Sequence, residues 1–199
     1  MKVAALAVAL AVALAAAPLR AQVTAAPRVL PPDRQIAAAV QPLAEDQRAG
    51  ATVLGYDAQM RLVRLREGTN HSICLADDPR DDRFHVACYH DSLEPFMARG
   101  RELRAQGVQG DAVDSTRFAD VMAGRFRMPP VAGLASLTGP ASGYDPATGA
   151  VTGARRLFVV YVPFATEEST GLPAAPRRDG PWLMHPGTPK AHIMFTPGM

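Results

Sequence analysis

The sequence predicts a single α+β domain in which two or three helices pack on one side of a mainly antiparallel sheet. Three observations lead there. Short strand-like runs follow one another closely, one clear amphipathic helix lies mid-chain, and strands and helices do not alternate regularly enough for a doubly wound fold. The 199 residues suffice for one domain with a hydrophobic core.

The N-terminus has the pattern of a secretory signal peptide over residues 1–21. Lys2 precedes an Ala/Val/Leu run, and Ala21 offers a small residue for cleavage before Gln22. The alternative is a membrane anchor, but a run of about 15 residues is shorter than the roughly 20 that span a bilayer. We therefore expect a secreted protein, periplasmic or extracellular, with a flexible leader at 22–32 and the domain at 33–199.

The charge balance argues against electrostatic binding to nucleic acid or membranes. The chain carries 21 Lys and Arg residues and 19 Asp and Glu residues. Cleavage after residue 21 removes Lys2 and Arg20 and no acid, so the mature chain is close to neutral. Without a basic excess we expect no nucleic-acid partner and no membrane partner after cleavage.

Two cysteines, Cys74 and Cys88, predict one disulfide in an exported chain. The alternative is a pair of metal thiolates, but an oxidising compartment and a spacing unlike Cys-x-x-Cys argue against it.

The first half of the domain predicts a helix, a hairpin and two further strands. Residues 33–46 have helical spacing, with Asp33 as N-cap and an interruption at Pro42. Residues 51–56 and 61–66 form the best hairpin signal. Strands at 72–75 and 84–89 flank an Asp-rich loop, which is expected to be solvated rather than a Ca²⁺ site because it lacks EF-hand spacing.

The clearest helix covers residues 91–106. Asp91 and Glu94 have capping-box spacing, and Gly107 suits the C′ position. An apolar stripe predicts which side is buried, and three arginines lie largely off it: the stripe is Leu93, Phe96, Met97, Gly100 and Leu103, and the arginines are Arg99, Arg101 and Arg104. A second short helix is expected at 115–123, with Asp114 as cap.

The remaining chain predicts two paired strands joined by a long loop. Residues 128–154 are rich in Gly, Pro and Ser and predict short strand or turn elements, including a turn at 144–149. Residues 156–162 read as a central strand, with 191–196 as partner. The loop between them contains six prolines, and loops of this length are uncommon unless functional or flexible.

Ligand-binding candidates lie in two clusters. The first is His85, Tyr89 and His90, where a histidine together with Asp91 or a distant histidine would form a metal site or an acid–base pair. The alternative is an exposed strand histidine and a histidine bonded to nearby backbone.

The second cluster lies at the end of the long loop. Trp182 would form a pocket wall, with His185 and Lys190 as polar groups. The alternative is that the tryptophan covers the open end of the sheet. We expect the two clusters to meet in one site, with His85, His90, His185 and His192 as candidate metal ligands.

No motif defines a reaction or a cofactor. The segment Glu167–Gly171 lacks the Gly-x-Ser-x-Gly context of a serine nucleophile and reads as a cap or turn. The leading hypothesis is an exported binding or accessory domain with a small-molecule or protein partner. The alternative is a small periplasmic hydrolase or metal-dependent enzyme that uses the clustered histidines. The oligomeric state is not defined by the sequence.

Overall fold

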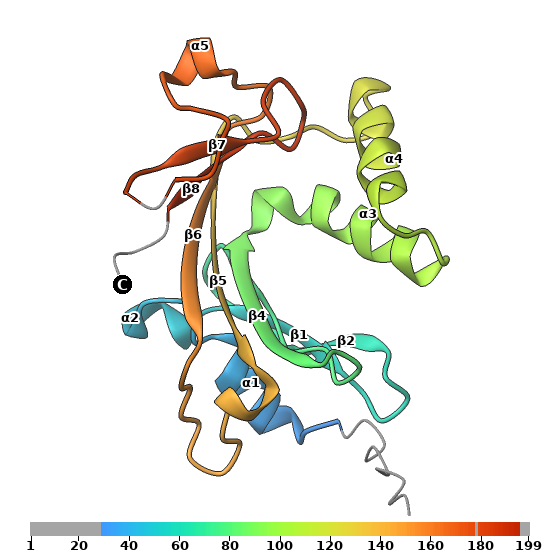
Figure 1. The fold of residues 1–199 in the computed structure, drawn as a ribbon. Coiled ribbons are helices and arrows are strands. Elements are labelled where there is room, and N and C mark those ends of the chain that lie inside the picture. The colour runs from blue at the N-terminus through green and yellow to red at the C-terminus, as the bar shows by residue number, and fades with distance from the viewer. Residues whose placement is uncertain (1–28, 178, 196–199) are drawn as a thin grey trace, which may run out of the picture.

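The computed structural model describes residues 29–177 and 179–195, in which eight strands form one open sheet (Figure 1). The predicted signal peptide and most of the predicted leader lie outside these residues. The strand order is β2-β1-β3-β4-β5-β6-β8-β7. Neighbouring strands are antiparallel except β1 and β3, which are parallel. The strands are β1 (Thr52–Tyr56), β2 (Leu62–Arg66), β3 (Ser72–Leu75), β4 (Arg83–His90), β5 (Ala132–Pro140), β6 (Arg155–Tyr161), β7 (Trp182–Met184) and β8 (His192–Phe195).

The helices in the described residues are short, and none of them has the length and apolarity needed to cross a bilayer. They are α1 (Pro32–Ala39), α2 (Glu45–Arg48), α3 (Glu94–Ala105), α4 (Asp111–Met122) and α5 (Glu167–Thr170), with 3₁₀ turns η1 (Asp91–Leu93) and η2 (Ala141–Gly143).

Helices α1 and α2 confirm the predicted broken helix. The chain leaves helical geometry around Pro42, whose ring cannot continue the hydrogen-bond ladder. The predicted cap is wrong, because Pro31 occupies the N-cap and Asp33 lies in the first turn. Pro32 is the first residue of α1, where proline is well tolerated because its missing N–H would have no partner inside the helix.

The expectation that the helices pack on one side is not confirmed, because helices contact both faces of the sheet (Figure 1). On one face, Ala38 of α1 packs with Phe84 and Val86 of β4. On the other, Phe96 of α3 packs with Tyr89 of β4. The middle of β4 is therefore buried on both sides. The α+β class and the mainly antiparallel sheet are confirmed.

The disulfide is present and joins neighbouring strands. Cys74 of β3 and Cys88 of β4 are direct partners in the antiparallel register, with their Cα atoms 4.0 Å apart. Both side chains are buried in the cluster under α1. The covalent bond therefore ties the register of β3 to that of β4.

Strand β5 replaces the short elements predicted within residues 128–154. It is nine residues long and lies between β4 and β6. Its sequence, Ala-Gly-Leu-Ala-Ser-Leu-Thr-Gly-Pro, has low intrinsic strand preference. Hydrogen bonds to neighbours on both edges hold it extended. The predicted turn after it is present, with Asp145 accepting a hydrogen bond from the Ala147 N–H.

Helix α3 confirms the predicted stripe, since Leu93, Phe96 and Leu103 are buried. Arg101 differs from the prediction, because it is only partly exposed and donates to Tyr89 and Glu94. Asp114 does not cap α4, which begins three residues earlier after Gly110.

The long loop contains regular structure of its own. Thr166 and Ser169 form a reciprocal capping box at α5, which confirms the interpretation of residues 167–171 as a cap or turn. The edge strand β7 then pairs with β8, and β8 pairs with β6 as predicted.

Candidate functional site

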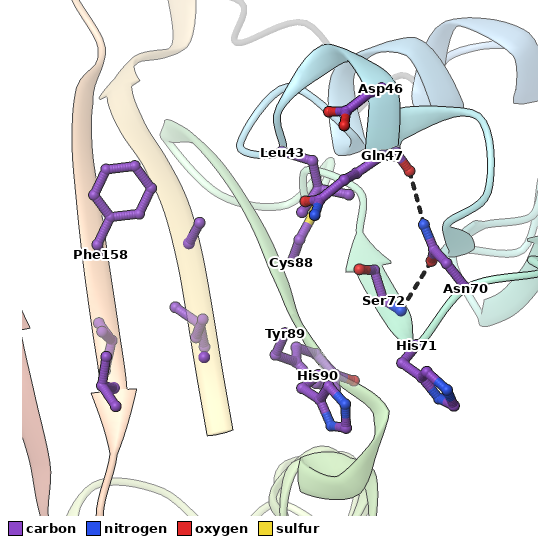
Figure 2. Close-up of a pocket in the computed structure, with 15 residues that line it drawn as sticks. Leu43, Asp46, Gln47, Asn70, His71, Ser72, Cys88, Tyr89, His90 and Phe158 are labelled. Atoms are coloured by element: carbon purple, nitrogen blue, oxygen red, sulfur yellow. Dashed lines mark hydrogen bonds between the residues drawn. The ribbon is translucent and has the colours of Figure 1, made fainter. Parts of the chain in front are cut away.

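An open groove of about 730 Å³ crosses the sheet face that carries α1 and α2, beyond the part these helices cover (Figure 2). One wall comes from α2 and the turn before it, with Leu43, Asp46 and Gln47. The Asn70 amide donates to the Gln47 carbonyl, at 2.9 Å between nitrogen and oxygen, and its own oxygen accepts from the Ser72 N–H at 3.0 Å. Asn70 therefore ties this wall to the start of β3.

The floor of the groove is apolar because of the sheet register. Ala135 of β5 pairs with Phe158 of β6, and Gly133 pairs with Val160. These residues alternate with others that point to the opposite face, so they share the groove side of the sheet. Phe158 is 41 % exposed although it is a large aromatic residue in an inner strand.

The apolar surface continues beyond the groove onto β8. Phe158 is the register partner of Phe195, which is 39 % exposed. Two exposed phenylalanines side by side on a strand pair are unusual for a surface that stays in water, and such patches often mark binding sites.

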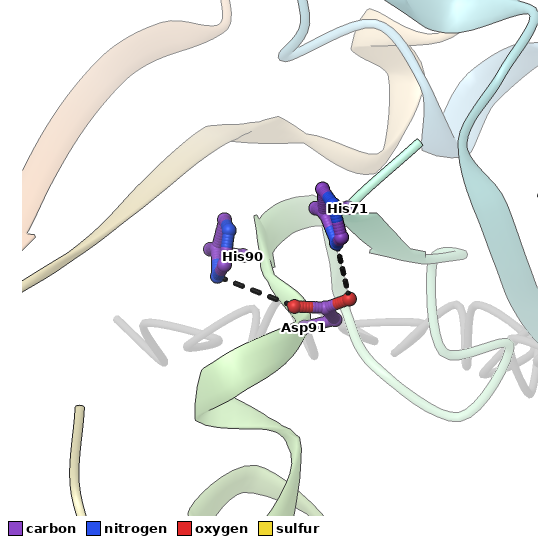
Figure 3. A group of neighbouring side chains, drawn as sticks. All are labelled: His71, His90 and Asp91. Carbon is purple, nitrogen blue, oxygen red and sulfur yellow. Dashed lines mark hydrogen bonds and ion pairs between the residues drawn. The ribbon is translucent and has the colours of Figure 1, made fainter. Parts of the chain in front are cut away.

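One end of the groove carries a cluster of His71, His90 and Asp91 (Figure 3). His71 Nδ1 lies 2.9 Å from Asp91 Oδ2, and His90 Nδ1 lies 3.3 Å from Asp91 Oδ1. The two imidazole rings stack with centroids 5.5 Å apart. One ligand atom from each residue lies within 4.8 Å of the other two. In the described residues this is the one group of three or more such side chains that meets that spacing.

The N-terminal candidate residues divide between different places. His90 belongs to the groove cluster. His85 lies near the other end of β4, where its Nδ1 contacts Thr138 Oγ1 at 2.7 Å and its backbone N–H donates to Asp77. The Tyr89 hydroxyl lies among α3 side chains, donating to Glu94 and accepting from Arg101. Burial raises the pKa of this phenol, which suits a structural role.

The C-terminal candidate residues form a second polar cluster. His185 and His192 have ring centroids 5.6 Å apart, and the His192 Nδ1 lies 2.6 Å from the Lys190 carbonyl oxygen. Trp182 pairs with Met194, two register steps along the same hairpin from the pair of Met184 and His192. Its indole N–H is buried and has no hydrogen-bond partner among the described residues.

This second cluster contacts α4. Lys190 Nζ lies 2.7 Å from Asp114 Oδ2, and Asp114 also pairs with the buried Arg117. Burial alone would raise the pKa of Asp114, but hydrogen bonds from Lys190 and Arg117 lower it overall. The ion pairs thus fasten the β7–β8 hairpin to α4.

The predicted clusters therefore occupy separate places. Strands β5 and β6 lie between β4, which carries His85 and His90, and β8, which carries His192. His71 was absent from the predicted site residues, and the structure adds it beside His90.

The comparisons with known proteins identify no relative: no family model, no curated protein and no solved structure matches this chain. The fold and the groove define it as an α+β protein with an open, partly apolar groove on its sheet.

Proposed function

We propose that this chain is an exported binding domain that holds a small amphipathic molecule in the groove beside α2. The observation that carries the proposal is the groove itself, with exposed Phe158 in its floor. Its volume of about 730 Å³ falls within the range of roughly 300–1,000 Å³ that is usual for ligand pockets.

The distribution of polar groups favours a ligand with two unlike ends. The β5–β6 floor offers only aliphatic and aromatic surface, through Ala135, Phe158 and Val160. Ser72 and His90 lie at the β3–β4 side and offer hydrogen-bonding groups. An apolar body on the floor and a polar head toward His90 would match both regions, since a few placed polar groups usually fix ligand orientation.

Export is part of the proposal. The pattern of residues 1–21 favours a signal peptide. The Cys74–Cys88 disulfide supports an oxidising compartment, because structural disulfides persist outside the reducing cytosol.

The test uses a residue that can block the groove without disturbing the core. A Cβ placed on Gly133 would meet no atom within 4 Å, and its backbone does not require glycine. Gly133→Trp should therefore fill the groove while the fold is kept. Gly180→Trp is the matched control, because Gly180 also has open space and does not line the groove.

The probe is 8-anilinonaphthalene-1-sulfonate, an amphipathic aromatic anion, titrated by fluorescence. We expect one saturable site, an affinity at least about tenfold weaker in Gly133→Trp, and no change in Gly180→Trp. Unchanged affinity in Gly133→Trp would place the bound probe elsewhere and contradict the proposal. If probe binding is lost when the protein self-associates, the groove would instead be an interface between two copies of this chain, which also contradicts the proposal.

The second candidate function is a small metal-dependent enzyme, as a hydrolase would be. The observation in its favour is the meeting of two imidazoles and a carboxylate at the groove end. In this alternative the amphipathic molecule is a substrate, and turnover depends on His71 and His90 rather than on His185 and His192.

A further inference from the structure

The cluster at the groove end has the composition of a metal site. His71 precedes β3, whereas His90 ends β4 and the next residue, Asp91, begins the turn into α3, so two neighbouring backbone segments supply the three side chains. We propose that His71, His90 and Asp91 bind a divalent transition-metal ion of the zinc, nickel or copper class. This site goes beyond ligand binding in the groove and does not depend on it.

The ligand types determine the class of metal. Imidazole nitrogen suits Zn²⁺, Cu²⁺ and Ni²⁺, whereas Mg²⁺ and Ca²⁺ prefer sites built from oxygen alone. Two nitrogens and one carboxylate oxygen therefore select against the hard cations. Three protein ligands also leave one position of a tetrahedral ion for water or a bound molecule.

The spacing requires only a small rearrangement. Ligand atoms about 2.0–2.1 Å from a tetrahedral zinc ion lie about 3.4 Å from one another. The present atoms lie within 4.8 Å of one another. All three side chains are well exposed, with 79 %, 48 % and 45 % of their surface accessible for His71, His90 and Asp91. Side-chain rotation can bring them together without repacking the core.

The backbone beneath the cluster is held firmly. The Asp91 N–H donates to the His71 carbonyl at 2.9 Å, and Ser72 pairs with His90 in the sheet. The disulfide between Cys74 and Cys88 locks the same strand pair two register steps further in. Such preorganisation lowers the entropy cost of bringing the ligands to a metal.

The contacts that a metal would replace are identifiable. His71 Nδ1 is paired with Asp91, and His90 Nδ1 contacts the Ser92 hydroxyl at 2.8 Å and accepts from the Ser92 N–H. A metal bound through Nδ1 displaces these exposed contacts, each worth little in water. Among the described residues that line the groove there is no Lys or Arg, so no fixed positive charge there opposes a cation.

The test is isothermal titration of Zn²⁺ into the purified, chelator-treated chain with its disulfide formed. We expect one bound ion per chain. His71→Ala and His90→Ala should each weaken binding by at least about tenfold, since even outer partners of a metal site contribute 10–100-fold. His85→Ala and His185→Ala are matched controls, because both histidines lie outside the cluster and should leave the affinity unchanged.

Each outcome decides the proposal. Wild-type affinity in both cluster variants, loss of binding in either control, or no binding to the wild-type chain at millimolar Zn²⁺ would overturn it. His71 is so exposed that its replacement should not affect folding, which circular dichroism checks. Because the readout is metal affinity, it is independent of the probe titration of Gly133→Trp.

Discussion

His71 lies opposite Asp91 because Cys74 lies opposite Cys88. The cysteines are register partners in the antiparallel β3–β4 pair, and stepping three residues outward along each strand reaches His71 and Asp91. Their side chains meet there, with 2.9 Å between His71 Nδ1 and Asp91 Oδ2. The structural crosslink and the candidate metal site are thus parts of one strand pair.

Loss of the disulfide should lower stability. The bond closes a short loop, which the chain-entropy model associates with about 3 kcal/mol. Replacing both Cys74 and Cys88 with alanine should reduce the free energy of unfolding by about that amount in urea titrations. Alanine is preferred to serine because the sulfurs are buried. Two freely alkylated thiols in unreduced wild-type protein produced in an oxidising compartment would contradict the pairing.

The β3–β4 register shows how much of the His71, His90 and Asp91 cluster could be predicted from the sequence. A disulfide between directly opposed strand residues would have placed His71 opposite Asp91 from numbering alone. The sequence supports strands at 72–75 and 84–89 and a bonded cysteine pair, but it does not show that the cysteines are exact cross-strand partners rather than diagonal ones. Unless the cysteines are known to be exact partners, nothing in the sequence places His71 near His90 and Asp91, because His71 lies just before the predicted strand.

The placement of the helices on the two faces of the sheet was predicted less well than the strands. The run from Val86 to Tyr89 is buried at every position, which is typical of a strand covered on both faces. Such a run indicates helices on both faces of the sheet, whereas helices on one side were predicted. Strand β5 was underestimated because its small residues, such as Gly133 and Ser136, prefer other conformations, and its neighbours determine its geometry.

The core role of α3 predicts a large effect at Phe96. This side chain is 1 % exposed and packs in the cluster with Tyr89 and Leu93. Phe96→Ala should cost about 3–5 kcal/mol in the free energy of unfolding. Met122→Ala is the control, because Met122 is 72 % exposed and should change stability by less than about 0.5 kcal/mol. Similar losses from the two variants would mean that the buried face of α3 is misassigned.

Arg101 should contribute to stability although it lies off the apolar stripe. It donates to the Tyr89 hydroxyl at 2.9 Å and to Glu94 at 2.6 Å. Arg101→Met keeps an apolar stem but leaves both partners short of a donor, so we expect a loss of about 1–3 kcal/mol by urea unfolding. Arg104→Met, at an exposed position on the same helix, should be nearly neutral. A neutral Arg101 variant would show that water replaces these contacts.

Acid should weaken the fold partly through His192. Burial lowers the pKa of this imidazole, so below its ordinary value of about 6.5 the unfolded chain binds a proton that the folded chain resists. The stabilisation is therefore present above about pH 6.5 and is lost as the pH falls below it. His192→Asn does not titrate and should lose less stability between pH 8 and pH 5 than the wild-type chain does. The same loss in both proteins would exclude His192 as a contributor.

The contribution of Asp77 to folding stability should change with pH in the opposite direction to that of His192. Burial, opposed by a hydrogen bond from the His85 N–H, raises the pKa of this carboxyl to about 6. Between its ordinary value of about 4 and pH 6, the folded chain holds a proton that the unfolded chain releases, so stability falls as the pH rises through this window. Above pH 6 the full cost of the buried charge is present.

Asp77→Asn removes that charge and keeps an oxygen that can accept from the His85 N–H. At pH 8 it should raise the free energy of unfolding by about 1 kcal/mol, a figure reduced for solvent screening because the side chain is partly exposed. At pH 4 the wild-type carboxyl is largely protonated, so the two proteins should be equally stable. Asp82→Asn, at an exposed position in the same loop, is the control and should show no such difference. If Asp77→Asn destabilises equally at both pH values, the carboxylate serves chiefly as a hydrogen-bond acceptor and its charge carries no cost.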